Sequence, residues 1–312
     1  MKIGVVGAGA WGKNLVRNLN DMGALCGIVD TSPVLRDSYR EQYPNTAIHE
    51  CLDSFLNTEF DAAIVAVPAP LHYEIAKRLL CAGKDILVEK PLTLTAVESE
   101  DLVNIAGENN KLLMVNHLLM YQPAVQWIKN AVNNGIVGKL NRIHQHRLGL
   151  GRARSVENVL WSLGVHDVAV ILYLTGTTPD NINAYGQWTL RTGIEDDVYL
   201  HLEFPGDIQS NLHCSWLWPE KNRGMVIVGS SGMLVYNEIE QKVYMHKKYI
   251  DKDLNNVDEG SELVYEGSGE PVKLMLEHFM DCIKTRNTPL SDGVNGLEVV
   301  KVLETASKEL KL

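Results

Sequence analysis

Two short motifs in this chain carry side chains that can handle protons. One is the triplet Glu89-Lys90-Pro91, and the other is a Leu-Gly-Val-His-Asp run at residues 163–167, which contains His166. An imidazole can accept a proton near neutral pH, and an ammonium group can stabilise negative charge that develops on an oxygen. Alone, a Lys-Pro pair after a strand favours a surface turn, and a helical histidine is often structural. Both motifs therefore need neighbours that support a function.

A glycine-rich loop near the N-terminus predicts a dinucleotide site. Gly7, Gly9 and Gly12 form a GxGxxG pattern between an apolar run and a helical segment, with Ala10 and Trp11 in the same loop. The first glycine allows a tight turn, the second lets the backbone approach a pyrophosphate, and the third allows close helix–strand packing. The helix N-terminus offers N–H donors to the phosphates.

An acidic residue closes the next predicted strand. Asp30 lies 18 residues after Gly12, close to the roughly 20 of the dinucleotide-binding pattern. Its carboxylate can accept hydrogen bonds from ribose hydroxyls and would repel a 2′-phosphate, and no arginine follows at once. The sequence therefore favours NAD over NADP. The alternative is a glycine turn followed by a helix-capping aspartate.

The composition is that of a packed globular protein. Its 312 residues are enough for two domains, and 45% of them are hydrophobic and 22% charged. There are 39 acidic and 29 basic residues, a net charge of −10, which argues against nucleic acid or an anionic membrane as a partner. No apolar run approaches the roughly 18 residues of a membrane helix.

The cysteines indicate a reducing compartment. They number five and form no Cys-x-x-Cys pair, so we expect reduced, mostly buried side chains. The first residues run directly into a predicted strand without a secretory signal. These observations predict a cytoplasmic protein. His144 and His146 alternate on a predicted strand without a third ligand, so no metal is expected.

The first third of the chain predicts alternating strands and helices. The expected strands are residues 2–6, 24–29, 61–67, 86–88 and 112–115, with helical segments between them. This order predicts a parallel, doubly wound Rossmann sheet, in which ligands bind at the carboxyl ends of the strands. Val67-Pro68 and Glu89-Lys90 lie at such ends.

After about residue 118 the pattern changes. Strand-like runs follow one another at residues 181–190, 198–204, 208–216, 225–228 and 233–236, which predicts a mostly antiparallel sheet. We expect a dinucleotide-binding domain over residues 1–118 and a substrate-binding and oligomerisation domain over residues 119–312, with helices at 274–285 and 296–310. The run Glu195-Asp196-Asp197 is expected to be a solvated turn.

Together these motifs resemble the Gfo/Idh/MocA family of oxidoreductases over nearly the whole chain. The resemblance implies an N-terminal Rossmann domain and a C-terminal α/β domain with a large, open, mostly antiparallel sheet. It also implies that Lys90 lines the active site and that the Lys90–Pro91 peptide is cis, which is inexpensive for an X–Pro bond. The cofactor-binding residues that it implies are Gly7, Gly9, Ala10, Trp11, Gly12, Asp30, Val67, Pro68, His72, Glu89, Lys90, Pro91 and Asn116.

The sequence departs from the family pattern at one position. Many relatives carry an aspartate four residues before the histidine, where this chain has Ser162. Asp167 cannot simply replace it, because on a helix it points about 100° away from His166. We therefore expect His166 to act as the general base and Lys90 to hold the hydroxyl and stabilise its oxygen, and the opposite division stays open.

Within the family the chain is similar to nucleotide-sugar 3-dehydrogenases that oxidise UDP-N-acetylglucosamine, through residues 117–125, 158–167 and 215–217. In that subgroup a serine at position 162 is ordinary. Arginines at 147, 152 and 154 either meet a diphosphate or form a solvated basic loop. The substrate-facing residues implied are Lys90, Tyr121, Arg147, Asn158, Trp161, Ser162 and His166.

Two other functions fit the same sequence. One is another sugar or polyol dehydrogenase or a ketoreductase of the same family, and the other is a non-catalytic NAD-binding sensor. An open sheet with an uncovered apolar face is usually buried in an assembly. Trp216 and Trp218 alternate on a predicted strand, so we expect a homodimer or homotetramer.

Overall fold

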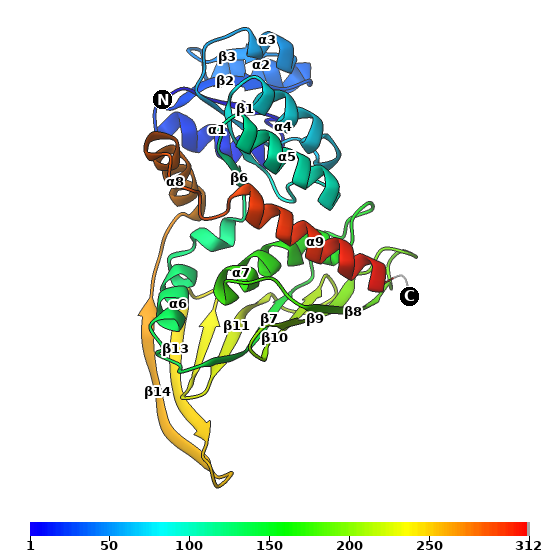
Figure 1. Ribbon diagram of the computed structural model, residues 1–312. Coiled ribbons are helices and arrows are strands. Elements are labelled where there is room, and N and C mark those ends of the chain that lie inside the picture. The colour runs from blue at the N-terminus through cyan, green and yellow to red at the C-terminus, as the bar shows by residue number, and fades with distance from the viewer. Residues whose placement is uncertain (311–312) are drawn as a thin grey trace. The chain divides into compact units, whose positions relative to one another are not determined.

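The computed structural model describes residues 1–310, which divide into two compact units (Figure 1). The first unit comprises Met1–Leu118 together with Glu270–Lys301, and the second comprises Leu119–Gly269 together with the chain after Lys301. None of the helices within residues 1–310 is both long and apolar enough to cross a membrane.

A six-stranded parallel sheet forms the centre of the first unit. Its order is β3-β2-β1-β4-β5-β6, and every neighbouring pair is parallel. All residues of β1 and β4 are buried, because helices cover both faces of such a sheet. The strands are β1 (Ile3–Val6), β2 (Leu25–Val29), β3 (Ala47–His49), β4 (Ala62–Val65), β5 (Asp85–Val88) and β6 (Leu113–Val115).

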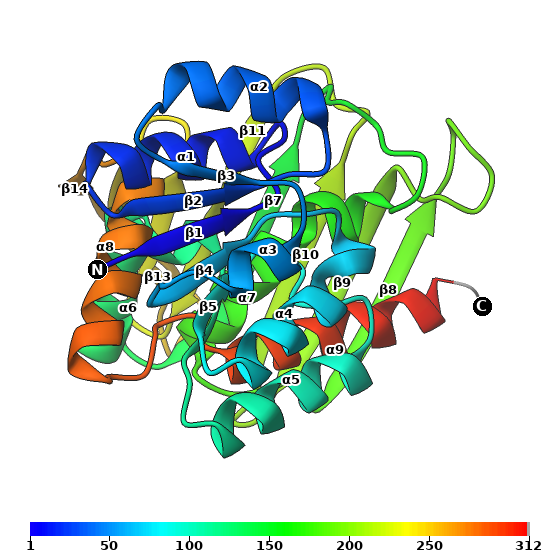
Figure 2. The ribbon, with the colours of Figure 1, turned by 90° about the horizontal axis from the view of Figure 1, so that it is seen from above.

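The helices of the first unit begin where local sequence signals place them. Ser32 Oγ accepts a hydrogen bond from the backbone N–H of Leu35, and Thr95 Oγ1 accepts one from that of Glu98, so both residues act as N-caps. Helices α4 and α5 pack side by side (Figure 2). The elements are α1 (Gly12–Asp21), α2 (Pro33–Gln42), α3 (Leu52–Leu56), η1 (Ala69–Leu71), α4 (His72–Cys81) and α5 (Ala96–Glu108).

The segment Glu270–Lys301 belongs with the first unit, although the sequence placed all of residues 119–312 in a second domain. Helix α8 (Pro271–Thr285) packs against α1. Arg286 forms an ion pair with Asp85 at 2.7 Å, and the backbone N–H of Val115 in β6 donates to the Ser291 carbonyl at 2.8 Å. A helical period does not reveal which sheet the helix covers, so this return could not be predicted from local patterns.

An eight-stranded sheet forms the second unit, in the order β14-β13-β12-β11-β7-β10-β9-β8. Only the β7–β10 pair is parallel among its seven neighbouring pairs. The strands are β7 (Leu140–Leu148), β8 (Asn181–Gln187), β9 (Asp197–Phe204), β10 (Ile208–Ser215), β11 (Asn222–Gly229), β12 (Met233–Asn237), β13 (Lys242–Ile250) and β14 (Asn256–Glu266).

Helices cover one face of the eight-stranded sheet (Figure 1). Helix α6 (Pro123–Asn133) packs against α7 (Val165–Thr175), and α7 packs on β7 and β10. Two short elements, η2 (Leu118–Tyr121) and η3 (Leu160–Gly164), lead into these helices, and α9 (Gly293–Glu309) ends the described chain. Strands are present in each of the runs where the sequence predicts them, and the sheet is mostly antiparallel.

Candidate active site

The three loop glycines of the first unit differ in what surrounds them. Gly7 has a φ of +91°, and a Cβ there would lie 2.7 Å from the backbone of Ala66. A Cβ at Gly12 would overlap the carbonyl oxygen of Gly7. A Cβ at Gly9 would meet no protein atom within 4 Å. Two glycines are thus required by packing, while Gly9 leaves its backbone open to a pyrophosphate, as a dinucleotide loop requires.

This difference predicts opposite effects for two alanine substitutions. Gly9→Ala will fold with a stability within about 0.5 kcal/mol of wild type, because no protein atom blocks its Cβ. It will weaken NAD binding by about tenfold or more, since the Cβ occupies the space that a phosphate approaches. Gly7→Ala will lower the stability itself, because of its positive φ and its contact with Ala66. Thermal unfolding and isothermal titration calorimetry measure the two effects, and NAD binding unchanged in Gly9→Ala would contradict the assignment.

Asp30 holds the glycine loop in place. Its Oδ2 accepts a hydrogen bond from the backbone N–H of Ala8 and its Oδ1 accepts one from that of Ser32, both at 2.9 Å. Tyr39 adds a second tie, because its hydroxyl donates to the Ala8 carbonyl at 2.7 Å. A carboxylate oxygen can accept more than one donor, so Asp30 remains suited to ribose hydroxyls at the end of β2.

Glu89, at the end of β5, connects three segments at the carboxyl ends of the parallel strands. Its Oε1 accepts hydrogen bonds from the Trp11 indole N–H, at 2.5 Å, and from the side-chain amide of Asn116. Burial raises the pKa of Glu89 to about 7. The glycine loop, the end of β5 and the end of β6 are thus joined beside Lys90, which is half-buried.

His72 joins two further segments of this edge. Its Nδ1 lies 2.8 Å from the carbonyl oxygen of Pro91, and its Nε2 lies 2.9 Å from that of Val67. Burial lowers the pKa of His72, and a neutral imidazole has one N–H to donate. Both nitrogens face backbone oxygens, so His72 holds these segments together and presents neither nitrogen to a ligand, unlike the cofactor contact expected of it. The Lys90–Pro91 peptide is cis, as the family resemblance implied.

Two adjacent residues after β6 carry polar atoms without partners. Asn116 and His117 are each 1% exposed, and Asn116 Oδ1 and both His117 ring nitrogens have no hydrogen-bond partner among residues 1–310. Burial, aided by the charge of Lys90, lowers the pKa of His117 to about 3, so its ring is neutral. Orphaned polar atoms at the carboxyl ends of parallel strands fit a polar ligand. His117 was not singled out from the sequence, although its place at a strand end would have indicated it.

In the second unit, His166 follows a break in helical geometry. Residues Leu160–Gly164 form one π-helical turn before α7 begins at Val165, and such turns are frequent at functional sites. His166 is partly exposed, whereas its neighbours Val165 and Asp167 are fully buried. Ser162, where many relatives have an aspartate, is 7% exposed. The helix therefore leaves the His166 imidazole partly exposed and buries the carboxylate of Asp167.

Asn158 and Trp161 stabilise the approach to this turn. Asn158 donates to Glu195 Oε2 at 2.7 Å and accepts a hydrogen bond from the backbone N–H of Trp161. The Trp161 indole donates to Ser307 at 2.8 Å. Both side chains, expected to face the substrate, thus make structural contacts. Tyr121, with the same expectation, is 1% exposed.

The acidic run after residue 194 is not a solvated turn. Glu195 and Asp196 are 6% and 1% exposed, and Asp196 Oδ2 accepts hydrogen bonds from the backbone of Thr189 and Leu190. The expectation was wrong because these carboxylates accept hydrogen bonds from donors outside the run, which a local charge run does not reveal. Across residues 1–310, no group of three or more acidic, histidine or cysteine side chains is placed to hold a metal ion.

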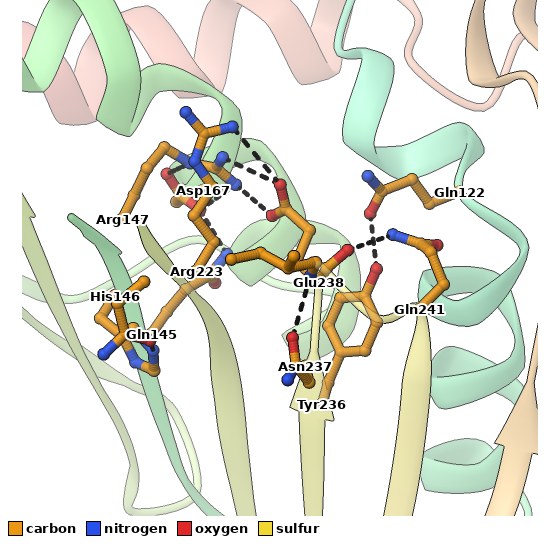
Figure 3. Close-up of polar contacts among 12 residues, drawn as sticks. Gln122, Gln145, His146, Arg147, Asp167, Arg223, Tyr236, Asn237, Glu238 and Gln241 are labelled. Carbon is orange, nitrogen blue, oxygen red and sulfur yellow. Dashed lines mark hydrogen bonds and ion pairs between the residues drawn. The ribbon is translucent and has the colours of Figure 1, made fainter. Parts of the chain in front are cut away.

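Arg147 is enclosed by carboxylates (Figure 3). Its Nε and Nη2 donate to the two oxygens of Asp167 at 2.6 and 2.9 Å, and Nη2 donates to Glu238 at 2.6 Å. Its side chain is 4% exposed. The expected diphosphate contact therefore does not fit Arg147, because its guanidinium is already occupied by two anions. Arg152 and Arg154 lie in an exposed loop.

The geometry defines a class of protein before any comparison. A parallel sheet in the order 3-2-1-4-5-6, a glycine loop with one open glycine, and an acid at the end of the second strand together form a dinucleotide-binding domain. Lys90 lies at the ligand-binding edge of that domain. This arrangement is typical of nicotinamide-dependent oxidoreductases.

Family models agree with this class. One described as an oxidoreductase family with an NAD-binding Rossmann fold matches residues 1–117, and the GFO/IDH/MocA C-terminal domain matches residues 125–235. The chain belongs to the Gfo/Idh/MocA family of oxidoreductases and carries its NAD-binding domain. The expected fold class and NAD as the cofactor are confirmed.

Several known proteins are similar over most of the chain. UDP-N-acetylglucosamine 3-dehydrogenase of Acidithiobacillus ferrooxidans is 24% identical over 301 residues, which is 96% of this chain and 94% of that protein. The solved structure of that enzyme, GnnA, aligns with a TM-score of 0.88 at 22% identity, covering 100% of this chain and 98% of that one. The Bordetella pertussis WlbA dehydrogenase, in complex with NADH and UDP-GlcNAcA, aligns with a TM-score of 0.82 at 18% identity, covering 100% and 96%.

Proposed function

We propose that this oxidoreductase oxidises a secondary alcohol of a UDP-sugar, at C3 of UDP-N-acetylglucosamine or of a related sugar. The observation that carries the proposal is the buried cluster in which Glu89 joins the glycine loop to the strand end bearing Lys90. The choice of sugar is supported by the named activity of the Acidithiobacillus relative, which is similar over nearly its full length.

Oxidation of an alcohol removes a proton from oxygen and a hydride from carbon. Bound NAD supplies the hydride acceptor. We assign His166 as the general base that takes the hydroxyl proton, and Lys90 as the cation that holds the hydroxyl and stabilises charge on its oxygen. The reverse assignment of the two roles makes the same use of both side chains.

The glycine loop, Asp30 and the segments joined by Glu89 and His72 would hold the cofactor. Because Arg147 is enclosed by carboxylates, we assign the diphosphate of the substrate to Arg152 and Arg154, which are exposed. A guanidinium matches phosphate geometry through paired N–H donors.

A substrate panel tests this function. Formation of NADH will be measured by absorbance with UDP-N-acetylglucosamine, other UDP-sugars, free N-acetylglucosamine, inositol and free hexoses. We expect kcat/KM for the best UDP-sugar to exceed that for its free sugar by about 100-fold or more, since lost phosphate contacts cost several kcal/mol. Preference for inositol or a free hexose would indicate a different dehydrogenase of the family. Tight NAD binding without reduction by any alcohol would indicate a sensor.

We also propose that the protein assembles as a homodimer or homotetramer through the open face of the eight-stranded sheet. Tyr185 and Tyr199 are paired across β8 and β9 and are 72% and 55% exposed. Tyr199 stacks on His213 at 3.9 Å, and Trp218 meets that imidazole edge-on. Trp216 is 2% exposed, so it belongs to the core. Light scattering of wild type will show an oligomer that Tyr199→Glu weakens, and a monomeric wild type would contradict the proposal.

A further inference from the structure

His72 is a buried histidine between the loops that follow two neighbouring strands of the parallel sheet. It begins α4 and is 1% exposed. A backbone hydrogen bond from the N–H of Glu89 to the Val65 carbonyl, at 2.8 Å, joins the ends of β4 and β5. Two residues further along each segment, the His72 imidazole lies between the carbonyl oxygens of Val67 and Pro91. A side chain thus continues the connection between the two strand ends.

The two carbonyl groups differ in their need for a donor. Pro91 is buried, whereas Val67 is partly exposed. Burial lowers the pKa of His72, so its ring is neutral and has one N–H to donate. A buried carbonyl without a donor is costly, whereas one near solvent can accept a hydrogen bond from water. The proton therefore belongs on Nδ1, which lies 2.8 Å from the Pro91 oxygen.

We propose that His72 is a positioning residue, whose Nδ1–H holds the Pro91 carbonyl and thereby fixes Lys90 for catalysis. Lys90 directly precedes Pro91, and residues 91–93 are all buried. On the other side of Lys90, Glu89 accepts hydrogen bonds from the glycine loop and from the end of β6. A misplacement of about 1 Å in a catalytic geometry can cost about 100-fold in rate. The inference rests on the proposed role of Lys90 in the reaction.

Two amide variants separate the two contacts of the ring. An asparagine amide can take the place of Nδ1, and a longer glutamine amide can take that of Nε2. His72→Asn will keep the hydrogen bond to Pro91, so kcat with the best sugar of the panel will stay within about threefold of wild type. His72→Gln keeps only the contact with Val67, so kcat will fall by about 10- to 100-fold. The KM values for NAD and for the sugar will stay within about twofold.

A second histidine of the same unit separates positioning from a loss of stability. His278 in α8 also has a ring–backbone contact, because its Nε2 accepts a hydrogen bond from the N–H of Leu290 at 2.9 Å. His278→Asn will lower the midpoint of thermal unfolding, as His72→Gln does, but will leave kcat within about twofold of wild type. Hydrogen exchange of residues 89–94, measured by mass spectrometry without ligands, will be faster in His72→Gln alone.

Three results would overturn the inference. They are equal kcat values for His72→Asn and His72→Gln, a loss of kcat in His278→Asn as large as that in His72→Gln, and unchanged hydrogen exchange in His72→Gln. If His72→Gln fails to fold, a loss of kcat by more than about tenfold in His72→Asn overturns it instead. A failure of the proposed function is seen separately, because Lys90→Met would then keep the turnover of wild type.

Discussion

Lys90→Met will lower turnover by roughly 10²- to 10⁴-fold, the usual contribution of a positioned proton-handling group. Methionine keeps most of the length of lysine but has no ammonium to hold the hydroxyl or stabilise its oxygen. Since the glycine loop and Asp30 are untouched, the affinity for NADH will stay within about threefold of wild type. Steady-state rates with the best substrate of the panel and fluorescence titration with NADH measure the two effects.

A matched lysine shows whether the loss is specific. Lys77→Met, on α4 of the same unit, removes an ion pair with Asp101 between side chains that are 39% and 41% exposed. Such surface pairs contribute little, so turnover will remain that of wild type. His166→Asn is expected to lose turnover as Lys90→Met does. Near-normal turnover in both Lys90→Met and His166→Asn would refute the pair.

Arg147→Ala will destabilise the second unit by about 3–5 kcal/mol, because removing one partner of a buried ion pair leaves uncompensated charge. Both Asp167, which is fully buried, and Glu238 then lose their principal cation. Five of the six tryptophans lie in residues 119–269. Urea unfolding followed by tryptophan fluorescence therefore reports mainly on this unit.

A control lies on the same strand. Arg142 in β7 is exposed and donates to Gln209 at 3.0 Å, so Arg142→Ala will cost no more than about 0.5 kcal/mol. Adding Asp167→Ala to Arg147→Ala will cost less than the sum of the single changes, since the pair is directly coupled. Equal unfolding midpoints for Arg147→Ala and Arg142→Ala would show that the network does not stabilise the unit.

Local signals allowed much of the first unit to be predicted. The glycine loop and Asp30 belong to one strand–helix–strand unit, and Lys90 ends a buried strand, so short windows of sequence contain the relevant physics. Strand β3 was missed because it has three residues, none of them buried. Backbone pairing with β2 holds this strand in the sheet, whereas its own side chains do not indicate a strand.

The partners of Arg147 could not be predicted from local sequence. A guanidinium suits phosphates and carboxylates equally well, and the sequence does not say which anion it meets. Its partner Glu238 lies 91 residues away, and the five strands β8 to β12 lie between the two residues in the chain. The return of Glu270–Lys301 to the first unit could not be predicted for the same reason. It depends on a contact between Arg286 and Asp85, which are 201 residues apart in the sequence.

That return affects how the protein is made on the ribosome. The first unit needs Glu270–Lys301 to complete it, and the second unit adds residues from Val302 onward to the contiguous residues 119–269. Until Glu270–Lys301 leaves the exit tunnel, Asp85 lacks Arg286 and β6 lacks its contact with Ser291. The Rossmann unit, most of which is synthesised before residues 119–269, therefore closes only after those residues have been made, against the usual N-to-C order in which domains complete their folding.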